Sequence, residues 1–439
     1  MNSRHEAKVT ARVGKLPRNR FFGPWPLGRF NARLQRVRRS RVKAAVRTVF
    51  CRCGGAAASP HPRRLHRSAG WIKKPWRTLG WLASAIESAQ RSLRSGTVCL
   101  AWLLLSFSAD TFAGDASTRA TFLKLIERPK VPLAPKISEL PQTNGLLRFH
   151  FTYAADAQQR VPGILIKGAS RGRRPVIISL HGTGGAKESQ VAFLTNAVSK
   201  GFIGVAIDGR YHGERTQQGK GAAAYHEAIL RAYQTGQEHP FLYDTVWDIL
   251  RLIDYLETRD DVDAGRIGVI GFSKGGMETY LAAAVEPRIA VAVPCIGVQS
   301  FRWALEHDAW KSRMETIQPA VNAAAQEAGL ELPDAEIVRK FYDRVVPGIY
   351  GPFDGPAMLP LIAPRPLLVI NGEIDPRTPL PGVEECAAAT RKAYAAQGAE
   401  EKFVLRIQKQ TAHKVNPDSL QAAMEWFEKW LKATGEREK

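Results

Sequence analysis

Short apolar runs alternate with longer segments of helical period from about Gly114 to the end of this 439-residue chain. Glycine, proline, asparagine and aspartate bound the apolar runs, which is typical of buried strands. These runs span residues 175–180, 203–207, 266–270, 289–295, 366–370 and 403–407, after two opening strands predicted at 146–154 and 161–168. Helices are predicted between strands, as at 243–260 and 420–434. The alternation predicts an α/β fold, with a mostly parallel central sheet and helices on both faces.

The stretch "GVIGFSKGG" places a single serine, Ser273, on the turn between a predicted central strand and a helix that is predicted to begin at 274 and to end before Pro287. A sharp strand-to-helix turn strains the backbone and crowds its neighbours, which accounts for the glycines at 271 and 275. The Ser273 hydroxyl then projects above the sheet edge at a helix N-terminus, where the helix dipole favours developing negative charge. Glycine-rich turns and helix N-caps also carry serine, so the motif alone leaves a nucleophile and an ordinary turn residue both open.

Partners for a catalytic serine follow Ser273 along the chain. A serine hydroxyl needs a general base, and the base needs a carboxylate that fixes its tautomer. His307 and His413 are the two histidines after Ser273; the first lies in a helical insertion and the second in the loop between the last strand and the last helix. Loops at strand ends hold catalytic groups, which predicts His413 as the base. Asp375, in the loop after the preceding strand, is the predicted acid, with Glu373 as its rival.

The loop "HGTGG" follows the predicted strand 175–180, the position from which the first oxyanion donor comes. The backbone amides of Thr183 and Lys274 are therefore predicted to form an oxyanion hole. His181 in the same loop is predicted to hold the loop by a hydrogen bond. The ammonium group of Lys274, directly after the serine, is expected to attract an acidic substrate.

A second polar loop, "DGRYHGER" at residues 208–215, also follows a strand end and is expected near the active-site face. Arg210 and His212 are candidate substrate-binding residues. The favoured interpretation is structural, with both side chains tying the loop to neighbouring carboxylates or carbonyls.

The motifs "HGTGG", "DGRYHGER", "GFSKGG", "NGEIDPRTP" and "TAHKV" together resemble the α/β-hydrolase superfamily over residues 145–435. More narrowly, the chain resembles the branch that holds dienelactone-hydrolase-like proteins, acetyl xylan esterases and prolyl-oligopeptidase-type catalytic domains. The resemblance implies Ser273 as nucleophile, Asp375 as acid and His413 as base. Lys274 departs from the pattern, because a small or apolar residue often follows the serine.

About 70 residues separate the strand ending near Cys295 from the strand beginning near Pro366. Helical periodicity there predicts a helical cap insertion, about 298–362, which emerges at the same sheet edge as Ser273. Closure over the site would limit the acyl pocket, so short acyl groups, acetyl to butyryl, are the expected substrates. Trp303, nearest the strand end, is expected to reach the pocket.

The basic charge is concentrated in residues 1–96, which hold 23 of the 63 Lys and Arg and two of the 41 acidic residues. The remaining residues carry 40 basic and 39 acidic side chains, so the net charge of +22 does not describe the catalytic domain, expected at 114–439. Residues 97–113 resemble a secretory signal peptide: arginines precede ten largely apolar residues, and small residues mark a cleavage site. We expect a periplasmic or secreted enzyme, without stable membrane insertion.

The basic segment 1–96 is open to three interpretations: a misassigned translation start, a genuine leader or basic tail, and a membrane anchor. No methionine lies between Met1 and Met277, so a misassigned start requires a non-AUG codon. A nucleic-acid binder would rest wholly on this segment, and no nucleic-acid partner is expected.

The five cysteines include two after the signal-like segment, Cys295 and Cys386, too few for a disulfide framework or a zinc site. A phosphate-binding glycine loop is absent from the sequence as well, so no cofactor and no metal is expected. The leading hypothesis is an exported serine hydrolase that cleaves small-molecule or carbohydrate carboxylic esters, of unknown oligomeric state. A prolyl-oligopeptidase-type peptidase and a non-catalytic binding protein on the same fold are the alternatives.

Overall fold

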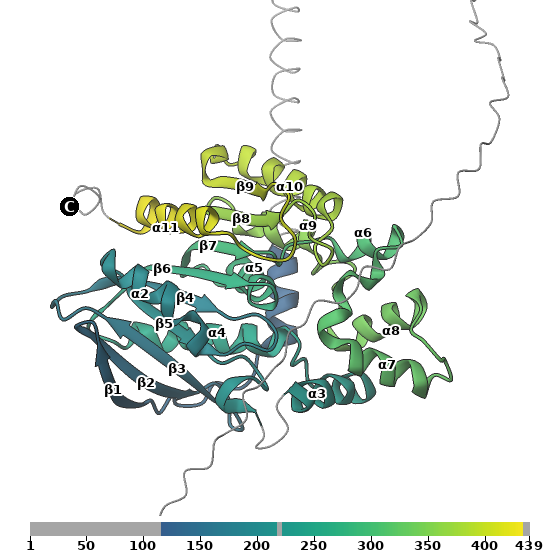
Figure 1. Cartoon of the computed structure of the whole chain (residues 1–439), viewed down its shortest axis with the longest axis horizontal. Helices are drawn as coiled ribbons and strands as arrows, with labels where there is room; N and C mark the ends of the chain where they lie inside the picture. The colour runs from purple at the N-terminus through teal and green to yellow at the C-terminus, as the bar shows by residue number, and fades with distance from the viewer. Residues whose placement is uncertain (1–115, 217–221, 433–439) are drawn as a thin grey trace, which may run out of the picture. The chain divides into compact units, whose positions relative to one another are not determined.

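The computed structural model describes residues 116–216 and 222–432 (Figure 1). The chain divides into two units, residues 1–79 and 80–439, and every described residue belongs to the second. The predicted basic leader and signal-like segment lie outside the described residues. Among the residues described, no helix is long and apolar enough to cross a bilayer.

The centre of the fold is a sheet whose strands lie in the order β1-β2-β3-β5-β4-β6-β7-β8-β9 (Figure 1). The strands are β1 (Lys136–Thr143), β2 (Leu146–Ala154), β3 (Arg160–Lys167), β4 (Arg174–Leu180), β5 (Ile203–Ile207), β6 (Val262–Phe272), β7 (Ile289–Cys295), β8 (Leu367–Gly372) and β9 (Phe403–Gln408). Strands β5, β4, β6, β7, β8 and β9 are parallel, and β1, β2 and β3 join them through antiparallel pairs. The predicted α/β fold with a mostly parallel sheet is confirmed.

Helices surround this sheet. They are α2 (Val191–Ser199), α3 (Ala222–Thr235), α4 (Tyr243–Glu257), α5 (Lys274–Val285), α6 (Phe301–Glu306), α7 (Gln318–Glu327), α8 (Ala335–Val345), α9 (Gly355–Met358), α10 (Leu380–Ala395) and α11 (Pro417–Leu431), after a helix at 116–126. Helix α5 ends two residues before Pro287, as the sequence predicts, because the residue before a proline disfavours helical backbone angles.

Alternate side chains of the parallel strands point to opposite faces, and each face is buried. In β4, Val176 and Ile178 join the core formed with α4 and α5, whereas Ile177 joins the core formed with α11. Helix α2 covers the same face as α11 further along, where Leu194 packs against Ala206 of β5. A strand covered on both faces has no polar alternation, which explains its uninterrupted apolar sequence.

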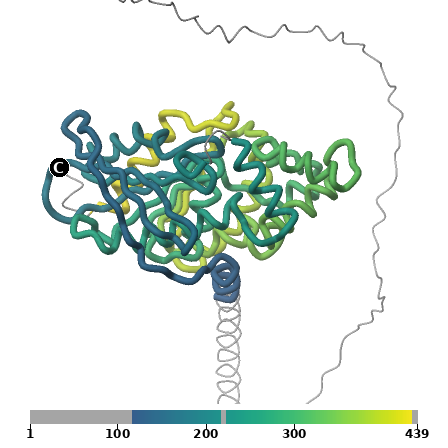
Figure 2. The backbone as a smooth tube through the Cα atoms, turned by 90° about the horizontal axis from the view of Figure 1, so that it is seen from below, coloured from purple at the N-terminus to yellow at the C-terminus, as the bar shows by residue number. Residues whose placement is uncertain are grey.

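The segment between β7 and β8 is helical, as predicted for the insertion at about 298–362. It comprises α6 to α9 and three short 3-10 turns, η3 (Trp310–Arg313), η4 (Glu315–Ile317) and η5 (Leu359–Ile362). Helices α7 and α8 pack on α3, which belongs to the loop region after β5. Figures 1 and 2 show these helices at the side away from β1–β3.

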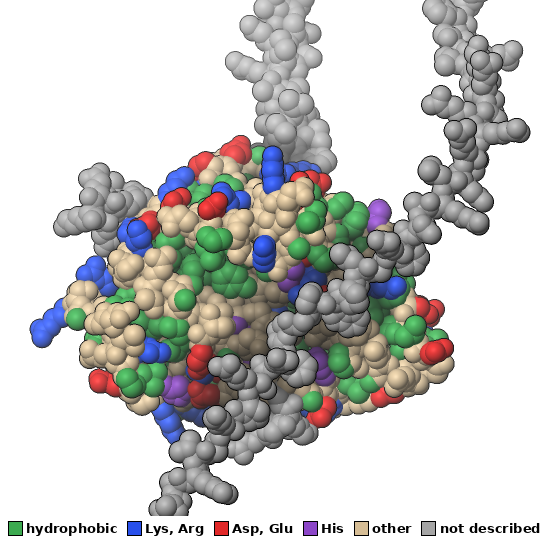
Figure 3. Space-filling view, viewed as in Figure 1, with side chains coloured by type: hydrophobic (Ala, Val, Ile, Leu, Met, Phe, Trp, Pro, Cys, Tyr) green, Lys and Arg blue, Asp and Glu red, His purple; other side chains and the backbone are tan. Residues whose placement is uncertain are grey.

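Basic and acidic side chains are interspersed on the face shown in Figure 3, without a large patch of one sign. This distribution agrees with the near-balance of charges after residue 96. The strongly basic composition of the whole chain therefore does not describe this face.

Candidate active site

Ser273 lies between β6 and α5 with an unusual backbone conformation, φ 56° and ψ −112°. Non-glycine residues rarely adopt this region, and such strain marks functional turns. The turn is crowded on both sides: a Cβ at position 271 would lie 2.1 Å from the Gly275 carbonyl oxygen, and a Cβ at 275 would lie 2.5 Å from the Leu180 oxygen. Both glycines are therefore required by close backbone contact, as predicted.

The three residues predicted as a triad form one hydrogen-bonded chain. His413 Nε2 lies 2.8 Å from Ser273 Oγ. His413 Nδ1 lies 2.8 and 3.0 Å from the two carboxylate oxygens of Asp375. With Nδ1 donating to the carboxylate, Nε2 is the acceptor that faces the serine hydroxyl. The arrangement matches what a serine nucleophile requires of its base.

Asp375 is buried, whereas its predicted rival Glu373 binds elsewhere. Burial opposes ionisation of Asp375, but hydrogen bonds from His413 and from the Arg377 amide outweigh it and lower the pKa of Asp375. The Glu373 carboxylate accepts a hydrogen bond from the backbone amide of Gln410 at 2.8 Å. Geometry therefore selects Asp375 as the partner of His413.

The loop after β4 lies directly beside the serine. A Cβ at Gly182 would lie 3.4 Å from Ser273 Cβ, which places the neighbouring Thr183 next to the nucleophile turn. Lys274 is the first residue of α5, and first-turn amides have no acceptor within their own helix. The Thr183 and Lys274 amides thus come from the two segments that an oxyanion hole requires, and their role stays a prediction.

Comparison with known proteins assigns the family. The family described as "Glucuronyl esterase, fungi" matches residues 163–398, more than half of the chain. The chain belongs to this family. The Bacillus subtilis (strain 168) protein YtaP, a hydrolase by its name, is 27% identical to this glucuronyl esterase family member over 186 residues, covering 42% of this chain and 53% of that protein.

A 4-O-methyl-glucuronoyl methylesterase of Thermothelomyces thermophilus is 28% identical over 184 residues, covering 41% of this chain and 43% of that protein. The chain thus spans about half the length of these two curated relatives. The solved structure of acetyl xylan esterase 1 from Thermoanaerobacterium sp. JW/SL YS485 has a TM-score of 0.50 at 18% identity, over 71% of this chain and 92% of that one. The predicted resemblance to the esterase branch of the α/β-hydrolase superfamily is confirmed.

The side chain of Lys274 is not available to an acidic substrate, which corrects the expectation from the sequence. Lys274 is 1% exposed, and its ammonium group forms an ion pair with Glu278, one helical turn further along α5. The helix turns this side chain toward the interior, because residues i and i+4 lie on the same helix face. In this glucuronyl esterase family member, Lys274 can offer only its amide to the site.

The loop after β5 is held by its own polar side chains. Arg210 is buried and binds Asp248 at 2.8 and 2.9 Å and Asp156 at 3.2 Å. His212 is also buried, with Nδ1 2.7 Å from the Arg210 carbonyl oxygen and its ring against Tyr225. The structural interpretation therefore fits both residues, and their assignment as substrate contacts is not supported.

His181 has the loop-holding geometry that its sequence position predicts. Its Nδ1 lies 2.8 Å from the Gly182 carbonyl oxygen, and its Nε2 accepts a hydrogen bond from the Gly209 amide at 3.0 Å. Burial, and then the Lys274 charge, lower the pKa of His181 to about 4 and that of His212 to about 2. Both rings are therefore neutral at neutral pH and serve as structural links between the loops.

These buried histidines predict acid sensitivity. The unfolded chain binds protons below about pH 6.5, whereas the folded protein does not until far lower pH, so stability must fall as pH falls. Each histidine contributes a loss of about 1.4 kcal/mol per pH unit over that window. In urea unfolding between about pH 7 and pH 5, the stability of His212→Asn should fall less steeply than that of the wild type. Parallel curves would contradict the shifted pKa of His212.

The insertion meets the loop that carries Asp375, a contact that no sequence motif indicated. Arg377, two residues after Asp375, binds Glu315 of η4 at 2.6 and 2.8 Å. Trp303 of α6 stacks on His307, with ring centroids 4.5 Å apart, and its ring also lies against Gly382 at the start of α10. Trp303 thus borders the segment after Asp375, while its entry into a substrate pocket stays a prediction.

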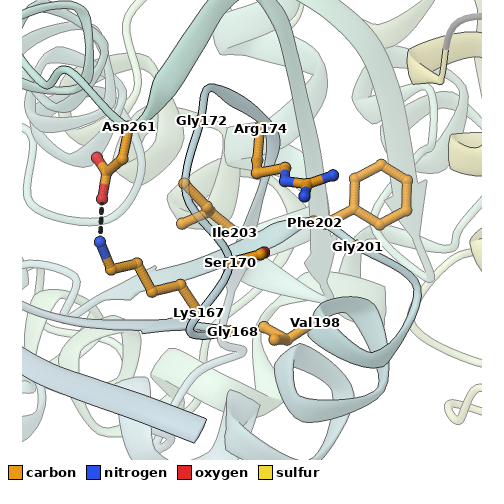
Figure 4. A pocket seen from close by; sticks show the side chains of 10 residues that line it. All are labelled: Lys167, Gly168, Ser170, Gly172, Arg174, Val198, Gly201, Phe202, Ile203 and Asp261. Carbon is orange, nitrogen blue, oxygen red and sulfur yellow. Dashed lines mark hydrogen bonds and ion pairs between the residues drawn. The ribbon is translucent and has the colours of Figure 1, made fainter. Parts of the chain in front are cut away.

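A separate small pocket lies at the amino-terminal edge of the parallel strands. Figure 4 shows Lys167 paired with Asp261 on one side and the Arg174 side chain on the other. Strands β4 and β6 begin here and end at the Ser273 side, so this pocket is remote from the triad residues. Among the described residues, no group of three His, Cys, Asp or Glu could hold a metal ion.

Proposed function

We propose that this protein is a serine esterase that cleaves carboxylic esters of carbohydrates through an acyl-enzyme on Ser273. The observation that carries the proposal is the chain of hydrogen bonds from Ser273 through His413 to Asp375. His413 Nε2 takes the hydroxyl proton as Ser273 Oγ attacks the ester carbonyl, and then gives that proton to the departing alcohol. A water activated by the same nitrogen releases the acid and restores the serine.

The family supports esters of uronic acids as the substrate class. In such an ester the sugar lies on the acyl side, whereas in an acetylated sugar it lies on the alcohol side. Both are carbohydrate esters, and both pass through the same tetrahedral oxyanion beside the Thr183 and Lys274 amides. Each well-placed amide contributes about 3 kcal/mol to transition-state stabilisation.

A substrate panel tests the proposal. We expect turnover of methyl glucuronate and of p-nitrophenyl acetate. Turnover of p-nitrophenyl dodecanoate should be slower, because we expect the helical insertion, which meets the Asp375 loop, to limit the acyl site. Trp303→Ala should raise the rate on the long ester relative to the short one by about threefold or more. Trp310→Ala is the matched control, since this half-buried tryptophan stacks against Lys311 instead.

Each alternative has its own outcome in the same panel. Faster cleavage of aminoacyl p-nitroanilides than of any ester would favour a peptidase. No turnover of esters or amides by a folded protein would favour a binding protein. Faster hydrolysis of the dodecanoyl than of the acetyl ester by the wild type would exclude the short-chain preference, and an unchanged profile in Trp303→Ala would remove this residue from the pocket.

We also propose export, on the basis of residues 97–113 alone. A carbohydrate esterase would meet polymeric substrates outside the cytoplasm. N-terminal sequencing of the exported protein should give a first residue near Gly114, and a first residue far upstream would contradict cleavage at this site.

A further inference from the structure

Arg313, the last residue of η3, lies beside the nucleophile turn. Its Nη2 donates to the Gly297 carbonyl oxygen at 3.1 Å. Gly297 in turn packs on that turn, since a Cβ there would lie 2.7 Å from the Ser273 carbonyl oxygen. One glycine therefore separates the Arg313 guanidinium from the backbone of the proposed nucleophile. Arg313 is only 6% exposed.

The charge of Arg313 has no ion-pair partner within residues 116–216 and 222–432. Its buried Nε–H has no hydrogen-bond acceptor there either. Burial lowers the pKa of Arg313, opposed by the nearby Tyr342 and Asp375. Burying a charge without a partner is costly, so such groups are normally paired.

Other buried cations of the protein follow that rule. Lys274 pairs with Glu278, and Lys187 pairs with Asp208. Arg365 is only half-buried, and it donates to three carbonyl oxygens at the end of α5 and beyond it. Arg313 differs from all of them, because one carbonyl oxygen is its only hydrogen-bond acceptor among the described residues.

Asp375, whose charge acts on Arg313, and Glu315, two residues after Arg313 along the chain, are already engaged. Asp375 is held by His413, and the Glu315 carboxylate by Arg377. A purely structural Arg313 would need only its contacts with the Gly297 oxygen and the Phe301 ring, 6.0 Å away, and neither requires a full positive charge. The Arg313 guanidinium, next to the nucleophile turn, therefore has a positive charge that an anionic ligand could neutralise.

We propose that Arg313 binds a carboxylate of the substrate, so that the preferred substrates are esters with a free carboxylate close to the scissile bond. Partly esterified acidic carbohydrates have this chemistry, with free and esterified acid groups on one molecule. A planar guanidinium suits a carboxylate because two parallel N–H donors meet its two oxygens. The inference rests on the proposed esterase function and concerns the specificity of the same site.

A pair of methyl esters that differ only in their terminal group tests this role. Monomethyl succinate carries a carboxylate where methyl butyrate carries a methyl group, and methanol release reports on both. We expect the wild type to have a kcat/KM about tenfold or more higher on the anionic ester. Arg313→Gln should remove that preference with at most about a twofold change on methyl butyrate, and Arg313→Lys should retain part of it.

Arg339→Gln is the matched control, because this exposed arginine lies in the same insertion on α8. An anionic preference unchanged in Arg313→Gln, or an equal loss on both esters, would overturn the proposal in favour of a structural role. If Arg313→Gln does not fold, the comparison of the two esters with the wild type decides. A higher wild-type kcat/KM on methyl butyrate than on monomethyl succinate would overturn the inference. Failure to hydrolyse any ester would instead overturn the proposed function.

Discussion

Ser273→Ala is expected to abolish ester hydrolysis while the protein stays folded. Loss of a catalytic nucleophile lowers kcat by a factor on the order of 10⁴ or more. The fold should tolerate the change, because the Ser273 hydroxyl makes no capping hydrogen bond to α5 and alanine occupies less space in the crowded turn. Turnover of p-nitrophenyl acetate and the thermal unfolding midpoint are the two measurements.

Labelling with a fluorophosphonate identifies the reactive hydroxyl independently of substrate choice. The label should map to Ser273 in the wild type and disappear in Ser273→Ala. Ser189→Ala is the control, since this exposed serine lies in the turn before α2, where its hydroxyl donates to the Ala186 oxygen and accepts from Gln190 Nε2. Substantial residual turnover in Ser273→Ala, or a label on another residue, would remove Ser273 from the mechanism.

Asp375→Asn is expected to cause the next largest loss, about 10³-fold or more in kcat but less than the loss of the nucleophile. An amide cannot stabilise the imidazolium, and its NH₂ group can impose the wrong tautomer on His413. Glu373→Gln should change kcat by no more than about threefold, because the Glu373 carboxylate holds the Gln410 amide and not His413.

The two substitutions form a matched pair, since each replaces one carboxylate of the same loop by its amide. The ratio of their kcat values is the deciding measurement. A larger loss in Glu373→Gln than in Asp375→Asn would reassign the acid, and equal losses would indicate a general effect on the loop.

The strands and helices of the parallel sheet could be read from the sequence because each has a strong local signal. The strands predicted at 203–207 and 289–295 have the same bounds in the structure. Strand β6 begins at Val262, four residues before the predicted 266, since the buried Val262 is followed by Asp263, Ala264 and Gly265, which are not buried and form no apolar run. Strand β1 was not predicted, because an edge strand with exposed residues has no apolar pattern.

The catalytic candidates could also be predicted from the sequence, because their order along the chain and their positions after strands limit which residues can form the triad. Ser273, Asp375 and His413 each follow a recognisable strand, and parallel strands bring their carboxyl ends to one edge. The sequence could not decide between Asp375 and Glu373, because the two carboxylates are only two residues apart in the same loop. Only the path of the loop resolves this choice.

Which charged side chains pair with one another could be seen only in the folded structure. Lys274 pairs with Glu278, Arg377 with Glu315, and Arg313 is left without a carboxylate among the described residues. From sequence, each of these side chains is one cation among many, and its partner depends on how the insertion docks. The alternation of strands and helices, the sharp serine turn and the order of the triad residues thus follow from local patterns along the chain. Which charges are neutralised and which remain for a substrate depends on contacts between residues far apart in sequence, because electrostatic interactions act through space.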